Sequence, residues 1–323
     1  MIVRAIAAAL ACLCLMLGAP PADAQTYPSH TVRIIVPFPP GGPTDVAARL
    51  ILQPLTSILG QTVIIENQSG AGGRSGSRYV ARAAPDGYTL LLGGTNLNSI
   101  IPALYKTMEY DAVKGFVAVA SIATDPTVMV VGANVKATTV AEFVADAKAN
   151  PGKLKYGSAP GLASHLAAEL LKERAGIDVP FIPYRGGAPA ITDLLGGQID
   201  MLFNNRSVLL QFILEGKLRA LAVTTTKRWP ELPNVPTMAE SGFPGFPEEV
   251  WYGLLAPAGT PAPIVEKLNA AVNDALKSPE LRANLAKLGN EAKIGTPAAF
   301  GAVLAADYEK YDAIVKSTGI KVE

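Results

Sequence analysis

Five glycine-rich or amide-rich loops carry the residues best suited to holding an anion. Each follows a short apolar run and precedes a helical pattern, and together they span 38–45, 93–98, 158–164, 184–187 and 204–206. Glycine allows the backbone to approach a ligand closely, and the N–H groups at a helix start carry partial positive charge. The loops therefore favour binding of an anion, either a carboxylate or a phosphate.

Catalytic and cofactor motifs are incomplete in this sequence. In 70–76 (GAGGRSG), Ser75 occupies the third glycine position of a dinucleotide fingerprint, and no P-loop sequence is present. Ser158 and Ser164 lie outside any G-x-S-x-G motif, and the adjacent His165 is poorly placed to act as a base for Ser164. The carboxylates stand on separate predicted elements without metal-ligand spacing: Asp45, Glu169, Asp193 and Asp200. We expect no catalytic residue, metal or cofactor, and an exported α/β hydrolase is the remaining enzyme hypothesis.

The charge balance excludes a broad electrostatic surface for polyanions. The chain of 323 residues has 28 Lys plus Arg against 27 Asp plus Glu, which gives a formal net charge of +1. Nucleic acid binding normally requires a basic patch or stripe. We therefore expect no nucleic acid partner.

The N-terminus has the pattern of a secretory signal peptide. Arg4 precedes an apolar run over 5–19, and the small-residue sequence Ala22-Asp23-Ala24 predicts cleavage after Ala24. A membrane-spanning helix needs about 20 apolar residues, and this run is shorter. Both cysteines, Cys12 and Cys14, lie within 1–24, so disulfides and thiolate chemistry are excluded from the remaining chain. The sequence predicts a soluble, exported protein located in the periplasm.

Short β-branched runs alternate with helical patterns along most of the chain. The strand–loop–helix order recurs at 31–59, 62–84, 155–174, 181–195 and 199–216. Such alternation predicts βαβ units and mainly parallel sheets. The length favours two domains, so we predict two α/β lobes with a ligand cleft between them. Lobe 1 would comprise 25–125 plus 225–323, and lobe 2 would comprise 126–224.

Several motifs taken together resemble the Bug family of periplasmic solute-binding proteins, which serve tripartite tricarboxylate transporters in Bordetella and related bacteria. The motifs that carry this resemblance are IVPFPPGGPTD at 35–45, ENQSGAGG at 66–73, APDGYTL at 84–90, PYRGG at 183–187, DLLGGQID at 193–200 and GKLRALAV at 216–223. The resemblance implies a type II periplasmic-binding-protein fold, a small carboxylate ligand, no covalent chemistry and integral membrane subunits as partners. The protein is expected to be a monomer.

The resemblance also implies a set of ligand-binding residues on the five loops. They are Phe38, Pro39, Gly41, Gly42, Thr44, Asp45, Thr95, Asn96, Asn98, Ser158, Gly161, Ser164, Tyr184, Arg185, Gly186, Asn204, Asn205 and Arg206. Hinge motion of the lobes would bury the ligand and form the surface that a membrane partner recognises.

Two departures from the family pattern bear on the ligand. The loop over 157–165 is one residue shorter than usual and contains Pro160, which affects contacts from Ser158, Gly161 and Ser164. Many relatives have Asp at the position of Asn204, and Arg206 lies close by in sequence. We therefore predict a di- or tricarboxylate, aromatic acids included, rather than an amino acid; the alternative is that Arg206 points to solvent. A carboxylate sensor that docks on a signalling receptor would use the same cleft.

Overall fold

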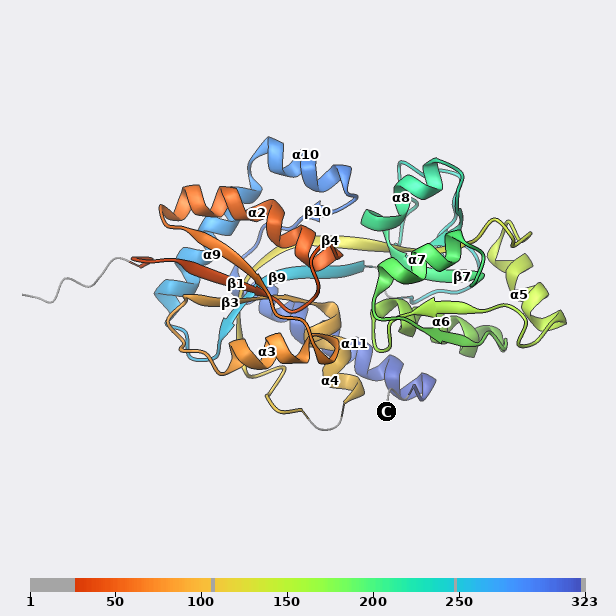
Figure 1. Cartoon of the computed structure of the whole chain (residues 1–323), viewed down its shortest axis with the longest axis horizontal. Coiled ribbons are helices and arrows are strands. Elements are labelled where there is room, and N and C mark those ends of the chain that lie inside the picture. The colour runs from red at the N-terminus through yellow and green to blue at the C-terminus, as the bar shows by residue number, and fades with distance from the viewer. Residues whose placement is uncertain (1–26, 106–107, 247–248, 321–323) are drawn as a thin grey trace, which may run out of the picture.

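The computed structural model describes residues 27–105, 108–246 and 249–320 as two α/β lobes that lie side by side along the long axis (Figure 1). The predicted signal peptide and its cleavage site lie outside these residues. The fold class predicted from the alternating strands and helices is confirmed, because each lobe is built around a sheet whose strands mainly share one direction.

Lobe 1 contains a six-stranded sheet. In spatial order its main path is β2 (Val63–Asn67), β1 (Val32–Val36), β3 (Thr89–Gly94), β9 (Glu249–Pro257) and the first part of β4 (Phe116–Val131), and β10 (Glu291–Ala292) also pairs with β4. The helical elements are α2 (Pro43–Leu59), η1 (Ala71–Gly73), α3 (Arg74–Ala81), η2 (Asn96–Ile100), α4 (Ile101–Leu104), α9 (Ala262–Leu276), α10 (Pro279–Lys287) and α11 (Pro297–Thr318).

Lobe 2 contains a five-stranded sheet in the order β8 (Arg219–Val223), the second part of β4, β7 (Met201–Asn205), β5 (Tyr156–Ser158) and β6 (Phe181–Pro183). Its helices are α5 (Val140–Ala149), α6 (Ala163–Ala175), α7 (Gly187–Leu195) and α8 (Arg206–Leu214). Side chains from α5 and α6 join one buried cluster, and side chains from α7 and α8 join another. The sheet is therefore covered by helices on both faces.

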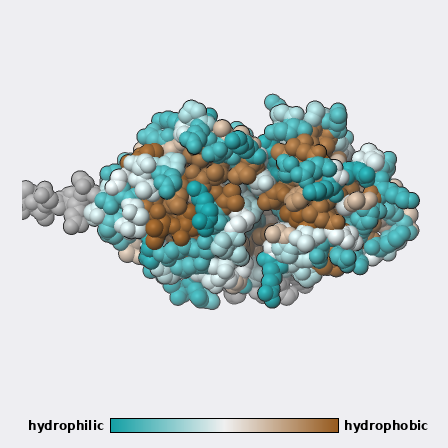
Figure 2. Space-filling view, turned by 45° about the horizontal axis from the view of Figure 1, so that its top comes forward, coloured by the Kyte–Doolittle hydropathy of each residue, from teal (hydrophilic) through white to brown (hydrophobic). Residues whose placement is uncertain are grey.

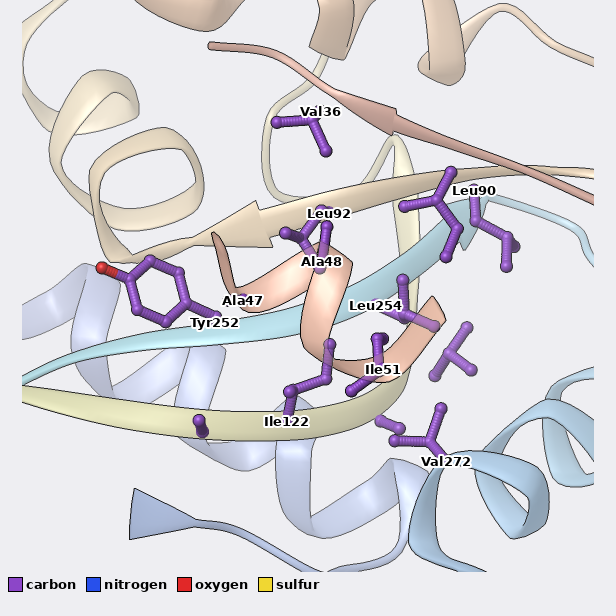
Figure 3. Close-up of a cluster of buried hydrophobic side chains, with 14 of the residues drawn as sticks. Val36, Ala47, Ala48, Ile51, Leu90, Leu92, Ile122, Tyr252, Leu254 and Val272 are labelled. Carbon is purple, nitrogen blue, oxygen red and sulfur yellow. The ribbon is translucent and has the colours of Figure 1, made fainter. Parts of the chain in front are cut away.

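Consecutive strand residues in lobe 1 face opposite sides of its sheet. Ile34 belongs to the cluster formed with α2 and α9, whereas Ile35 belongs to the cluster formed with α3 and α11. Leu254 and Leu255 on β9 divide in the same way. Figure 3 shows Ala47, Ala48 and Ile51 of α2 packed among the strand residues of the first cluster, with Val272 of α9 beside them. Burial on both faces explains why these strands read as continuous apolar runs.

Strand β4 passes from one lobe into the other. Up to Pro126 it pairs with β9 in lobe 1, and from Thr127 onward it pairs with β7 in lobe 2. A second connection runs back from lobe 2 to β9. At the lower side of Figure 1, α11 extends from lobe 1 and contacts α6 of lobe 2.

The segment 225–246 packs with lobe 2 rather than with lobe 1. Trp229 and Leu232 belong to the buried cluster of α7 and α8, and Met238 and Phe246 belong to the cluster of α5 and α6. The sequence analysis assigned this segment to lobe 1, with a boundary near 225. We therefore propose lobe boundaries near 126 and between 246 and 249, in place of boundaries near 125 and 225.

A close contact between β9 and α11 yields a test of the lobe 1 core. A Cβ added to Gly253 would lie 2.3 Å from Cζ of Phe300 and 2.8 Å from the backbone oxygen of Ala120. Gly253→Ala should therefore lower the free energy of unfolding by about 1–3 kcal/mol, measured by urea denaturation. The matched control is Gly301→Ala within α11, where the new Cβ would meet only Cβ of Ala118 at 3.8 Å. This control should be neutral or stabilising by up to about 1 kcal/mol; equal destabilisation of both variants would contradict the packing argument.

Candidate ligand-binding cleft

The strand directions place the two sets of glycine loops opposite one another. Strands β1, β2 and β3 run in the same direction as β4, because β3 and β4 are both antiparallel to β9. Strands β5, β6 and β7 run in the opposite direction, because β7 is antiparallel to β4. The carboxyl ends of both sets therefore point toward the gap between the lobes. Figure 2 shows the surface hollowed there, with hydrophobic residues on both lobes beside the hollow.

Four helices begin at this gap without a side-chain cap from their own N-cap residue. The N-cap residues are Gly42 for α2, Leu162 for α6, Gly186 for α7 and Asn205 for α8. By contrast, the N-cap side chains of α5, α10 and α11 accept a hydrogen bond from their own first turn. The first N–H groups of a helix have no partner within the helix. At the gap they are therefore available to a ligand or to residues from elsewhere in the chain.

In the loop after β1, the Asp45 carboxylate holds the backbone in shape. The side chain is almost fully buried and accepts hydrogen bonds from the Gly41 N–H at 2.9 Å, from Asn67 Nδ2 at 2.9 Å and from Arg49 Nε at 2.7 Å. Asn67 also donates to the Phe38 oxygen at 3.0 Å. Gly41 has φ +82°, a left-handed conformation that glycine adopts without steric cost. Both Asp45 oxygens are thus engaged by the protein itself.

These contacts also determine the charge state of Asp45. Burial by itself would raise the pKa of this carboxyl group. Hydrogen bonds from Arg49, from the Gly41 N–H and from Asn67 outweigh it, so the pKa of Asp45 is lowered from its usual value. Asp45 is therefore ionised at neutral pH, and its hydrogen bonds hold the loop that leads into α2.

The loop after β3 contributes one contact that joins the lobes. Thr95 Oγ1 accepts from the Trp251 N–H at 2.9 Å, and Asn98 Oδ1 accepts from the Gly94 N–H at 3.2 Å, so both side chains are used inside lobe 1. Asn96 is different. Its Oδ1 accepts from the Ala163 N–H at 2.9 Å and thereby caps the start of α6 in lobe 2. Asn96 therefore forms a direct hydrogen bond across the cleft.

The loop after β5 has no arrangement of a serine nucleophile with its base. Ser158 Oγ and Ser164 Oγ lie 2.6 Å apart, whereas Nδ1 of His165 accepts from the Gly161 N–H at 3.2 Å. The His165 ring also stacks on Phe181 with centroids 4.2 Å apart, and burial lowers the pKa of His165. His165 therefore holds the loop through its contacts with Gly161 and Phe181. Among the described residues, no group of three or more His, Cys, Asp or Glu side chains could hold a metal ion.

The loop after β6 leaves one cation free. The Tyr184 hydroxyl donates to Asp193 Oδ2 at 2.7 Å, and the tyrosine ring lies against Gly157. Next to it, Arg185 is exposed at the start of α7, and it forms no hydrogen bond or ion pair with the described part of the chain. Gly186 follows as the N-cap of α7. This loop therefore offers an unpaired guanidinium beside an uncapped helix start.

In the loop after β7, Asn204, Asn205 and Arg206 make different contacts. Asn204 Oδ1 accepts from the Asn205 N–H at 2.8 Å, while the Asn204 amide lies close to Gly187 at the start of α7. Arg206 donates to Glu231 Oε1 at 3.0 Å, and its guanidinium lies 5.3 Å from the Trp229 ring centroid. Arg206 also packs against Gly289 of lobe 1. Its side chain is mostly buried and paired with Glu231, so it does not point to solvent; among the predicted site residues, Arg185 is the cation without a partner in the described part of the chain.

Sequence reasoning missed three residues that organise the cleft. Asn67 supports the loop after β1, Glu231 engages Arg206, and Asp125 accepts hydrogen bonds from Ser207 in the first turn of α8. Asn67 lies in the motif over 66–73, but nothing in the sequence distinguished it as a residue that supports the loop after β1. Glu231 and Asp125 lie outside every loop motif, because their contacts bridge distant parts of the chain.

A two-lobed α/β fold with opposed helix starts is the architecture of periplasmic binding proteins. Residues 47–320 match the family described as "Tripartite tricarboxylate transporter family receptor", and the chain belongs to this family. The Bug resemblance is confirmed: the chain is 37% identical to BugT of Bordetella pertussis over 307 residues, covering 94% of each chain.

Two solved structures are also similar over nearly the whole chain. One is an R. palustris protein with adipate, at 36% identity and a TM-score of 0.86, with 91% of this chain and 99% of that chain covered. The other is MatC from Rhodopseudomonas palustris with bound malate, at 34% identity and a TM-score of 0.83, with 90% and 100% covered. The class of the protein is thus a solute-binding receptor of a transporter family. Within the described residues, no helix is long and apolar enough to span a membrane.

The Asp45 contacts predict a specific pH dependence of stability. Because the folded pKa is lowered, the stabilisation is present above the unfolded aspartate pKa of about 4 and is lost as the pH falls through the folded value. Asp45→Asn should reduce the free energy of unfolding by about 1–3 kcal/mol at neutral pH, and the difference from wild type should shrink in acid. The exposed Asp274, which pairs with Lys277, provides the control variant Asp274→Asn. A difference at Asp45 that is constant with pH would contradict this assignment.

Proposed function

We propose that this chain captures a small di- or tricarboxylate between its lobes and delivers it, unchanged, to the integral membrane subunits of a tripartite tricarboxylate transporter. The observation that carries the proposal is that α2 and α7 begin at the gap without a side-chain cap from their N-cap residues, next to Arg185, which has no partner in the described part of the chain. The family match and the two similar proteins with adipate and malate support this ligand class.

The helix starts suit reversible capture of an anion. Backbone N–H groups and helix dipoles stabilise a carboxylate through neutral donors. A fully buried cation would bind more strongly but would also oppose release, since separating a buried ion pair is costly. An exposed guanidinium such as Arg185 adds attraction at the cleft edge without this penalty.

The two lobes are expected to open and close around the ligand. In the structure the Asn96–Ala163 hydrogen bond joins them, and opening must break it. Within the described residues, β4 is the only strand that runs through both sheets. Rotation of one lobe relative to the other would therefore occur near Pro126, where β4 crosses, and where the chain returns into β9.

The proposal also includes location and activity. The N-terminal pattern over 1–24 would direct export to the periplasm, with cleavage after Ala24. The protein would act as a monomer, with no cofactor and no turnover of its ligand. Ser158 and Ser164 pair with each other rather than with a base, which supports a binding role over hydrolysis.

Calorimetry with the mature protein tests the function. Malate, adipate and citrate should bind with a stoichiometry of one and remain chemically unchanged, whereas neutral sugars should give no heat. Binding of an amino acid alone would contradict the predicted ligand class. Release of a product during the titration would contradict the binding role.

Arg185 provides a sharper test within the same titration. We expect Arg185→Gln to weaken dicarboxylate binding roughly five- to twentyfold, because a charge-assisted hydrogen bond at an accessible site contributes about 1–2 kcal/mol. Thermal stability should not change, since Arg185 has no partner in the described part of the chain. Arg228→Gln is the matched control, because Arg228 is paired with Glu240 outside the cleft loops. Unchanged affinity in Arg185→Gln, or an equal loss in the control, would remove Arg185 from the site.

A further inference from the structure

Asp125 lies where β4 leaves lobe 1 and enters lobe 2. It pairs with Val250 in the sheet of lobe 1, and two residues later Thr127 pairs with Asn205 in the sheet of lobe 2. The residue is completely buried, although aspartate is rarely buried without a partner. Its position at the crossing requires an explanation beyond packing.

The partners of Asp125 belong to the ligand loop of lobe 2. Its Oδ1 accepts from the Ser207 N–H at 3.2 Å, and its Oδ2 accepts from Ser207 Oγ at 2.5 Å. Its backbone oxygen accepts from Asn205 Nδ2 at 3.3 Å. Ser207 is in the first turn of α8, so Asp125 supplies the cap that the N-cap residue Asn205 does not. One residue of the crossing strand thus holds both the start of α8 and the loop before it.

The surroundings allow this carboxyl group to change its charge near neutral pH. Burial raises the pKa of Asp125 to about 7, against the opposing effects of the Ser207 hydrogen bonds, Arg206 and Asn205. The charged or titratable groups near it are Arg206 on α8, itself paired with Glu231, and Tyr252 on β9, whose pKa is raised by burial. On β10, Glu291 is paired with Lys293 and stands opposite Thr124, the neighbour of Asp125.

We infer that Asp125 is a positioning residue that links the crossing strand to the ligand loop: its ionised carboxylate holds Ser207 at the start of α8, and its backbone oxygen holds Asn205, in the arrangement that binds the anion. The inference rests on the proposed function for its effect on affinity. When Asp125 takes up a proton, one of its oxygens becomes a donor, and the charge that favours the helix start is lost. The loop is then held less firmly, and carboxylate binding weakens.

The sign of the pH effect separates positioning from simple stabilisation. Because the folded pKa of Asp125 is raised, its contribution to folding stability is greatest below the unfolded aspartate pKa of about 4 and is lost as the pH rises to about 7. Ligand affinity should follow the opposite trend and fall as the pH decreases through 7. A purely structural role would not make affinity and stability change in opposite directions.

The test is calorimetric titration of malate and adipate into the mature protein at about pH 8 and about pH 6. In the wild type we expect both ligands to bind about fivefold more weakly at the lower pH, the scale of losing one helix cap. Asp125→Asn, a neutral residue of the same shape, should bind at both pH values as the wild type does at the lower one. Asp146→Asn, at an exposed aspartate of α5 bonded to Asn150, is the matched control and should behave as the wild type.

A second variant shifts the titration instead of removing it. Ser207→Ala deletes one hydrogen bond that lowers the pKa of Asp125, so the pH at which affinity falls should move upward. Wild-type affinity that is constant from about pH 8 to about pH 6, or a pH dependence retained in Asp125→Asn, would overturn the inference.

Hydrogen exchange of the ligand-free protein separates failure of this inference from failure of the proposed function. At about pH 8, amides over 204–210 should exchange faster in Asp125→Asn than in the wild type, and the difference should vanish at about pH 6. If neither dicarboxylate binds but this difference is present, the proposed function fails and the positioning role of Asp125 stands. Identical exchange in both proteins at about pH 8 would overturn the positioning role.

Discussion

The hydrogen-bond ladders of β4 are the interaction on which the rest of the structure depends. The same strand pairs with β9 and β10 in lobe 1 and with β7 and β8 in lobe 2. Because β1–β3 run with β4 and β5–β7 run against it, the carboxyl ends of both sets face the same gap. Without this shared strand, the two sets of glycine loops would belong to independent domains and would not face the same gap.

The first backbone N–H groups of the helices are satisfied in different ways, and α9, away from the gap, also begins without a side-chain cap. Helices α5, α10 and α11 are capped locally by Thr139, Ser278 and Thr296. At the gap, α6 receives its cap from Asn96 of the other lobe, and α8 receives its cap from Asp125 on the crossing strand. The starts of α2 and α7 have no comparable side-chain cap from their N-cap residues. The cleft therefore combines a supported part, which fixes the loops, with donors that remain available for an anion.

Several predicted site residues form hydrogen bonds within their own lobe. Asp45, Thr95 and Asn98 each use their side chain to hold nearby backbone within lobe 1. This separation of roles suits a binding protein, because supporting contacts keep the donors in place through each cycle of capture and release. The unpaired Arg185 and the engaged Arg206 show the same division among the cations of lobe 2.

Local patterns in the sequence were sufficient to predict the α/β class, the strand–loop–helix order and the loops that meet at the gap. An apolar run indicates a strand buried on both faces of its sheet, and glycine indicates a tight turn. Each of these patterns is contained within a few consecutive residues. The extent of lobe 2 was predicted less well, because residues 225–246 pack through scattered side chains such as Trp229 and Met238 without a regular period.

Only the tertiary structure decided which polar side chains remain free. Arg206 pairs with Glu231, which lies 25 residues away in the sequence. The Ala163 N–H donates to Asn96, 67 residues away, and the Ser207 N–H donates to Asp125, 82 residues away. Sequence spacing carries no information on such partners, because chain folding and strand pairing bring them together. The sequence therefore determined which loops follow the strands, whereas the fold determined which of their polar groups are already engaged within the described part of the chain.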